Sequence, residues 1–189
     1  MHSQQHLPRS HPCRAWRIEL SGAKKRDSRA NSRRIILLCA LFFFLYRPAP
    51  TGAATLTSSG GWVAEIGSSD LLFGAGSDLK DGYSSPVAAT TLEVSGCADQ
   101  SEEWEIRIRF GDQIWDNHFS LAAKLTSKGT GEGVIIGGDT FQVITASDTI
   151  FLTGQGDQSG ITVQYQLTGV SIQILPENYS TTVEFTITP

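Results

Sequence analysis

Histidine and cysteine are scarce in this sequence of 189 residues, which contains four histidines and three cysteines. Only His118 and Cys97 lie beyond residue 54. A structural zinc site needs about four nitrogen or sulfur ligands, and an intrachain disulfide needs two cysteines. The part of the chain after residue 54 therefore lacks the residues for either. Cys97 is expected to be a free or buried thiol, with an intermolecular bridge as the alternative.

Sequence motifs of common enzymes are absent as well. The chain has no G-x-S-x-G motif, which excludes the nucleophile elbow of serine hydrolases. The glycines of GTGEG (129–133) are not followed by the Lys-Ser/Thr pair of a phosphate-binding loop. Glu102, Glu103 and Glu105 fall in a charged loop and on the wet face of an expected strand, which indicates a solvated surface. We therefore expect a protein that is not an enzyme.

No apolar run reaches the roughly 20 residues that a membrane-spanning helix needs. The longest, IILLCALFFFLY from Ile35 to Tyr46, has twelve residues, with the basic stretch RDSRANSRR before it and RPAPTGAA after it. A basic flank, a short apolar core and small residues are typical of a secretory signal. We expect a cut after Ala54. A buried helix or a short uncleaved anchor is the alternative.

Charge divides the chain at residue 54. The first 54 residues carry ten Lys or Arg against two acids, whereas the remainder carries five against 17. Such a split indicates segments with different roles. An acidic domain repels phosphate, which excludes nucleic acid as a partner. The predicted organisation is a basic leader with a start codon that is open to misassignment (1–34), a signal core and cleavage region (35–54), a looser N-terminal part of the mature protein (55–90) and a β-sandwich core (91–189). Within the leader, residues 1–25 look like neither core nor strand.

Strand patterns dominate after residue 54, and helix periodicity is nearly absent. WEIRIRF (104–110) and ITVQYQL (161–167) alternate apolar with polar residues. The GGD sequence at 137–139 predicts a hairpin over 134–145 with Phe141 and Val143 facing inward. A step of three residues at Thr168 and Gly169 indicates a β-bulge, or else a strand break. The predicted fold is an all-β, antiparallel, immunoglobulin-like β-sandwich, with a small β-barrel as the alternative.

The final segment, VSIQILPENYSTTVEFTITP, contains a proline, a short turn, a tyrosine and a Thr/Val-rich alternating strand. It resembles the closing segment of bacterial spore coat U and chaperone-usher pilin-like surface subunits. The resemblance covers about 20 residues, and Glu177 and Asn178 stand where those proteins usually have glycine. It implies an incomplete immunoglobulin-like fold that a strand from a neighbouring subunit completes.

The function predicted from these patterns is that of a secreted, non-enzymatic structural or adhesive component of a bacterial cell-surface assembly, pilus-like or coat-like. Partners would be other surface-protein subunits or further copies of the chain, joined by β-strand addition, and the membrane would be met only during export. Segment 55–80 is the predicted donor of a strand. The candidate partner-binding residues are Tyr179, Thr182, Glu184, Thr186, Trp62 and Trp115.

The alternative function is a secreted module that binds a carbohydrate or another ligand. Trp115, in a predicted turn, would be its stacking platform. No cofactor is expected, although loop carboxylates suit Ca²⁺, and Asp112 and Asp157 are the first candidates for such a site.

Overall fold

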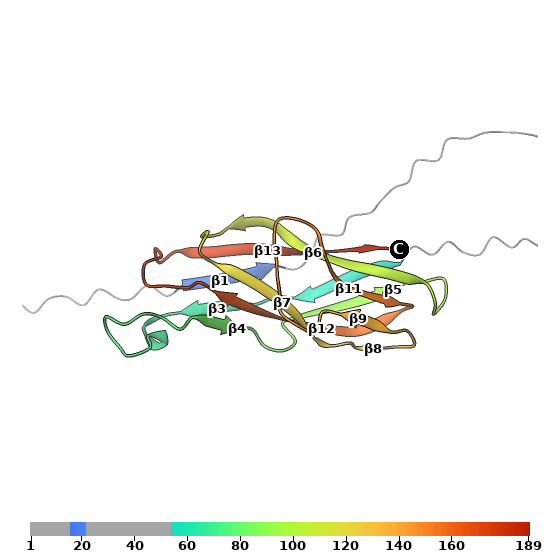
Figure 1. Ribbon diagram of the computed structural model, residues 1–189, viewed down its shortest axis with the longest axis horizontal. Coiled ribbons are helices and arrows are strands. Elements are labelled where there is room, and N and C mark those ends of the chain that lie inside the picture. Colours follow the sequence, from blue (N-terminus) through green and yellow to red (C-terminus); the bar gives the residue numbers. More distant parts are fainter. Residues whose placement is uncertain (1–15, 22–53) are drawn as a thin grey trace, which may run out of the picture.

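The computed structural model describes residues 54–189 and the backbone of residues 16–21. These residues form a β-sandwich-like structure of two packed sheets, with one 3₁₀ turn at Ser68–Asp70 and no α-helix in the described ranges (Figure 1). All strand pairs are antiparallel except one, and neither sheet closes on itself. The all-β prediction is confirmed, and the small barrel is wrong.

The first sheet contains six strands in the order β3-β1-β13-β6-β11-β9. Their bounds are Val63–Ile66 (β3), Trp16–Ser21 (β1), Asn178–Thr188 (β13), Glu103–Ile114 (β6), Thr149–Gln155 (β11) and Ile135–Gly137 (β9). The second sheet has the order β10-β7-β12-β5-β2, and two short strands pair with β12 beside this path. Its bounds are Gln142–Val143 (β10), Ser120–Ser127 (β7), Gln158–Thr168 (β12), Thr90–Ser95 (β5), Thr55–Gly60 (β2), Gly82–Ser84 (β4) and Thr130–Gly131 (β8).

The core lies between the sheets and follows the predicted alternation. On β6, Ile106 and Ile108 are fully buried, while Arg107 between them is half-buried on the other face. On β12, Tyr165 is buried and its hydroxyl lies 2.9 Å from Thr90 Oγ1, so its polar end has a partner inside the core. Burial of every second residue is what a strand with one wet face requires.

The predicted hairpin over 134–145 is wrong. Strand β9 pairs with β11 in one sheet, whereas β10 pairs with β7 in the other. Gly137 and Gly138 have φ angles of 92° and 72°, and the chain passes from one sheet to the other after them. The inward residue also shifts by one position, because Ile144 is 2% exposed and Val143 is 55% exposed. A shift of one residue exchanges the two faces of a strand.

The irregularity at Thr168 and Gly169 is a strand break and not a bulge. Strand β12 ends at Thr168, Gly169 has φ +82°, and the next strand begins at Asn178. A Cβ atom added at Gly169 would lie 1.9 Å from the carbonyl oxygen of His118. The close approach and the positive φ both require glycine.

Replacing Gly169 with alanine is therefore expected to destabilise the protein more than the same change at Gly160. Gly160 also has positive φ (+73°), but no atom lies within 4 Å of its added Cβ. Both changes place an alanine at a positive φ angle. Only Gly169→Ala adds a clash of the new Cβ with the backbone, which should cost a further ~1–3 kcal/mol. Urea denaturation of the two variants measures the difference. Equal losses of unfolding free energy would contradict it.

Segment 55–90 is less loose than its composition indicates. Residues 55–60 and 63–66 are strands β2 and β3, one in each sheet, and both are paired within this chain. The donation of a strand by segment 55–80 stays a prediction. The connection between β3 and β4 is mostly exposed and carries Phe73, which is 91% exposed. The remaining predictions for the leader and the signal fall on residues 1–15 and 22–53, outside the described residues.

Candidate functional site

A strand from the N-terminal leader occupies a position inside the first sheet. Strand β1 lies between β3 and β13 and is drawn in blue beside the C-terminal strand in Figure 1. It runs parallel to β13, from Arg17 opposite Asn178 to Ser21 opposite Thr182. It runs antiparallel to β3. We call this position between β3 and β13 the β1 slot. The expectation that residues 1–25 contain no strand is wrong for 16–21.

The sequence WRIELS explains why this segment forms a strand. Large apolar residues alternate with polar ones over six positions, which is the two-residue period of a half-buried strand. The register places Ile18 opposite both Ala64 and Tyr179, each 7% exposed. Arg17 stands opposite Glu65, which is exposed. The apolar positions of β1 thus match core positions of its neighbours, a signal that the basic composition of the leader obscures.

The β1 slot has the geometry of a strand-binding site. Within the described residues, β3 pairs with no strand other than β1. Neighbouring strands lie about 4.8 Å apart, so β3 and β13 are separated by roughly twice that distance and cannot bond to each other directly. Without β1, the edges of both strands would present unpaired backbone donors and acceptors, which attract an extended segment.

Tyr179 lies at this slot, but on the core face. Its ring packs edge-to-face on Phe119 with ring centres 4.9 Å apart, and its hydroxyl donates to the Leu175 carbonyl at 2.9 Å. Thr182, Glu184 and Thr186 are half-exposed on the opposite face of β13. Of the candidate partner-binding residues on this strand, Tyr179 is therefore packed in the core, and the other three lie on the outer surface.

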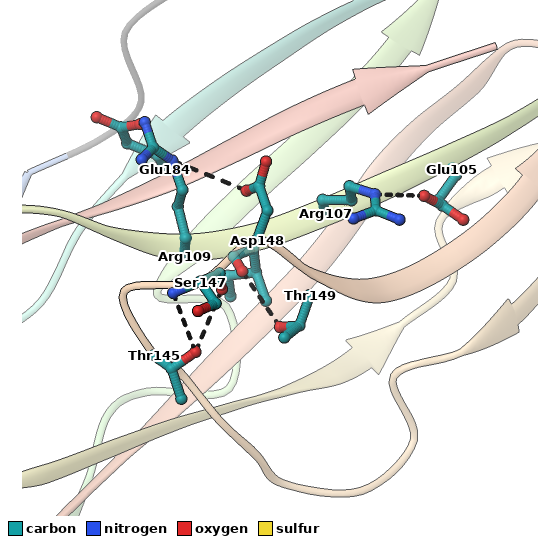
Figure 2. A network of polar contacts seen from close by, with 9 residues as sticks. Glu105, Arg107, Arg109, Thr145, Ser147, Asp148, Thr149 and Glu184 are labelled. Atoms are coloured by element: carbon teal, nitrogen blue, oxygen red, sulfur yellow. Dashed lines mark hydrogen bonds and ion pairs between the residues drawn. The ribbon is translucent and has the colours of Figure 1, made fainter.

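The outer face of the first sheet carries paired charges, shown in Figure 2. The Arg109 guanidinium donates to the Glu184 carboxylate at 2.5 Å, and its Nε lies 3.8 Å from Asp148. Arg107 and Glu105 form a second pair along β6. Partly exposed pairs of this kind contribute about 0–1 kcal/mol each. Glu184 is thus paired with an arginine of its own chain, and this partly exposed face carries two arginines and three carboxylates in contact with one another.

The candidate tryptophans pack against their own domain. Trp115 is half-buried between Phe110 and Phe119, at ring-centre distances of 6.0 and 5.3 Å, and its indole N–H donates to the Phe119 carbonyl. Trp62 is half-buried against the core. Trp104 is 2% exposed. A flat stacking platform for a sugar requires an open ring face, which two neighbouring rings restrict at Trp115.

The acidic residues considered for calcium lie on different elements. Asp112 is on β6, and Asp157 is in the turn between β11 and β12, where its carboxylate accepts a hydrogen bond from the Cys97 N–H at 2.9 Å. In residues 16–21 and 54–189, no group of three or more His, Cys, Asp or Glu side chains is arranged to hold a metal ion.

Burial, together with the hydrogen bond to the nearby Asp157 carboxylate and its negative charge, raises the pKa of the Cys97 thiol to about 11. The thiolate is the reactive form, so Cys97 is expected to alkylate slowly at neutral pH. Asp157→Asn removes the second cause and leaves the first. Iodoacetamide should then modify Cys97 about two to ten times faster, because a lower pKa increases the thiolate fraction.

The rate is measured by mass spectrometry at pH 8 in a chain whose Cys13 and Cys39 are replaced by serine. Glu103→Gln, which removes an exposed carboxylate on β6, is the charge-matched control and should leave the rate unchanged. An unaltered rate in Asp157→Asn would contradict the effect of the carboxylate on the thiol.

Within the described residues, no helix has the length and apolar character needed to cross a membrane. Comparison of the chain with protein-family models, curated proteins and solved structures found no match.

Proposed function

We propose that the protein is an exported, non-enzymatic structural or adhesive component of a bacterial cell-surface assembly, in which subunits are joined by β-strand addition. The observation that carries this proposal is the β1 slot. An extended segment from far along the chain pairs there with two strands at once. Backbone hydrogen bonds would give affinity for an added strand, and alternate side chains would give selectivity.

The proposed export route strengthens the argument. A cut after Ala54 would separate residues 16–21 from strands β3 and β13, which both lie C-terminal to it. The mature chain would keep the two walls of the slot without the strand between them. We further propose that the two sheets belong to an immunoglobulin-like sandwich, which the antiparallel pairing and the single shared core support.

A pair of threonine variants on β13 tests the proposed assembly. Thr182 stands in register with Ser21 of β1, whereas Thr186 lies beyond the β1 register, and both are half-exposed on the outer face. Thr182→Asp should weaken assembly at the slot at least severalfold, and Thr186→Asp should have little effect. The exported wild-type and variant proteins are compared by light scattering and electron microscopy. Wild-type protein that stays monomeric at every concentration would contradict the proposed function.

A further inference from the structure

We infer that residues 16–21 are a built-in blocking strand for the β1 slot. In the uncut chain they fill the slot from within the same molecule. Their removal opens it to an extended segment of another polypeptide that carries large apolar residues at three alternating positions. This inference rests on the proposed function, because it names what occupies the strand-addition site before assembly and what chemistry the later partner must have.

The pairing of β1 is extensive for so short a strand. Five of its residues are in register with β13 and four with β3, so the segment is bonded along both edges. A central strand leaves no open edge at its position, whereas its loss would create two. The blocked and open states of the slot therefore differ by the presence of this one segment.

The register defines the chemistry of any segment that replaces β1. The apolar residues of β1 are in register with buried residues of β3 and β13, and the polar residues of β1 are in register with exposed or half-exposed ones. The apolar pairs are Trp16 with Ile66, Ile18 with Ala64 and Tyr179, and Leu20 with Thr181. Ile66 is fully buried, and Thr181 is 3% exposed. A substitute strand needs large apolar side chains at these three positions, because a charged residue there would enter the core without a counter-charge.

The blocking strand is attached to the sandwich by a long connection. Residues 22–54 join β1 to β2 and number 33. At about 3.3–3.6 Å per residue, a chain of that length could span up to ~120 Å, so the length of the connection does not by itself hold β1 in the slot. The leader is also basic and the part after residue 54 acidic, which favours their association. The predicted cut after Ala54 lies at the end of this connection.

Disulfide trapping tests whether the chain's own strand fills the slot. Arg17 and Glu65 are directly opposite across β1 and β3, whereas Val63 is opposite Glu19. Opposed Cα atoms lie about 4.5–5.5 Å apart, within disulfide range, while Arg17 and Val63 are separated by roughly 8 Å. The full chain is used, with its three native cysteines replaced by serine.

We expect Arg17→Cys/Glu65→Cys to form an intramolecular disulfide under mild oxidation, at least ten times faster than Arg17→Cys/Val63→Cys. Both pairs place the second cysteine at an exposed position of β3, which makes them well matched. Similar rates for the two pairs, or dimers only, would overturn the inference that the strand blocks the slot from within the same molecule.

Peptide binding tests the open state. The probe is a fluorescent peptide of residues 14–23, RAWRIELSGA, and the receptor is full-length Ile18→Pro, in which proline interrupts β1. Ser28→Pro, in the leader but outside β1, is the control. The peptide can bind only molecules whose slot is open, so its apparent affinity falls in proportion to the fraction of open molecules. Ile18→Pro should therefore bind the peptide at least ~10 times more tightly than wild type or Ser28→Pro does. A peptide with aspartate in place of its isoleucine should bind neither.

Equal binding to Ile18→Pro and wild type would overturn the inference. If Ile18→Pro does not fold, as judged by circular dichroism, the disulfide rates still decide it. The two proposals can fail separately. If the exported protein assembles but the full chain does not form the Arg17–Glu65 disulfide, the blocking strand is wrong and the proposed function stands. If the disulfide forms but the exported protein never assembles, the blocking strand stands and the proposed function is wrong.

Discussion

Val183→Asp should leave the sandwich unfolded at neutral pH. Val183 is 2% exposed in the middle of β13, opposite Phe110 of β6. An aspartate at this position would place a carboxylate in the core without a partner, and it would also lose the packing of the valine. A buried unpaired charge and a lost apolar side chain together are expected to cost more than ~4 kcal/mol, a large part of the 5–15 kcal/mol that stabilises a typical domain.

Thr182→Asp is the matched control, because it introduces the same side chain one residue earlier on the same strand. Thr182 is half-exposed on the outer face, so its carboxylate would remain in water. Circular dichroism and thermal melting should show a folded Thr182→Asp and an unfolded Val183→Asp. A cooperative melting transition for Val183→Asp near the wild-type temperature would contradict the inward position of Val183.

Trp104→Ala is expected to cause the second large loss of stability. Trp104 is 2% exposed, and its indole N–H donates to the Gly156 carbonyl at 2.8 Å inside the protein. Its ring lies directly over Gly154, where an added Cβ would come within 2.3 Å of the ring. Removing so large a buried side chain should cost about 3–5 kcal/mol in urea denaturation. Trp115→Ala is the control and should cost less, because Trp115 is only half-buried and its indole N–H donates a longer hydrogen bond, 3.3 Å, to the Phe119 carbonyl.

A double-mutant cycle tests whether the Trp104 ring and Gly154 interact. Gly154→Ala alone should destabilise the protein, because the new methyl group and the Trp104 ring cannot occupy the same space. In the Trp104→Ala background the same methyl group should enter the vacated volume at little cost. Additive losses from the two changes would show that the ring and Gly154 do not interact.

The sequence pattern predicted local structure where one face of a strand is buried and the other is wet. For β6, β12 and β13 the alternation and the observed burial agree, because each strand lies in a sheet with a single core on one side. The pattern failed at residues 134–145, where a glycine turn suggested pairing between adjacent segments. Those segments pair with different sheets, and a choice between partners depends on distant residues.

The candidate site illustrates the same division. The residues of WRIELS alternate between apolar and polar, but they lie in a basic leader whose composition indicates targeting and not a strand. Its significance depends on β3 and β13, which lie about 45 and 160 residues further along the chain. No local pattern reports such a pairing, because backbone hydrogen bonds between strands carry little sequence information beyond the side chains that flank them.

The sequence alone predicts that the chain is all-β after residue 54, that this part has only one histidine and one cysteine for catalysis or metal binding, and which positions of β6, β12 and β13 face inward. These properties follow from composition and from the two-residue period of a strand, which are local. The tertiary structure decided the order of the strands, the crossing of 137–145 between sheets and the place of the C-terminal strand between β6 and β1. Those features depend on which strands pair, and the strands lie far apart in the sequence. Every strand edge offers the same backbone donors and acceptors, so a local pattern does not specify the partner.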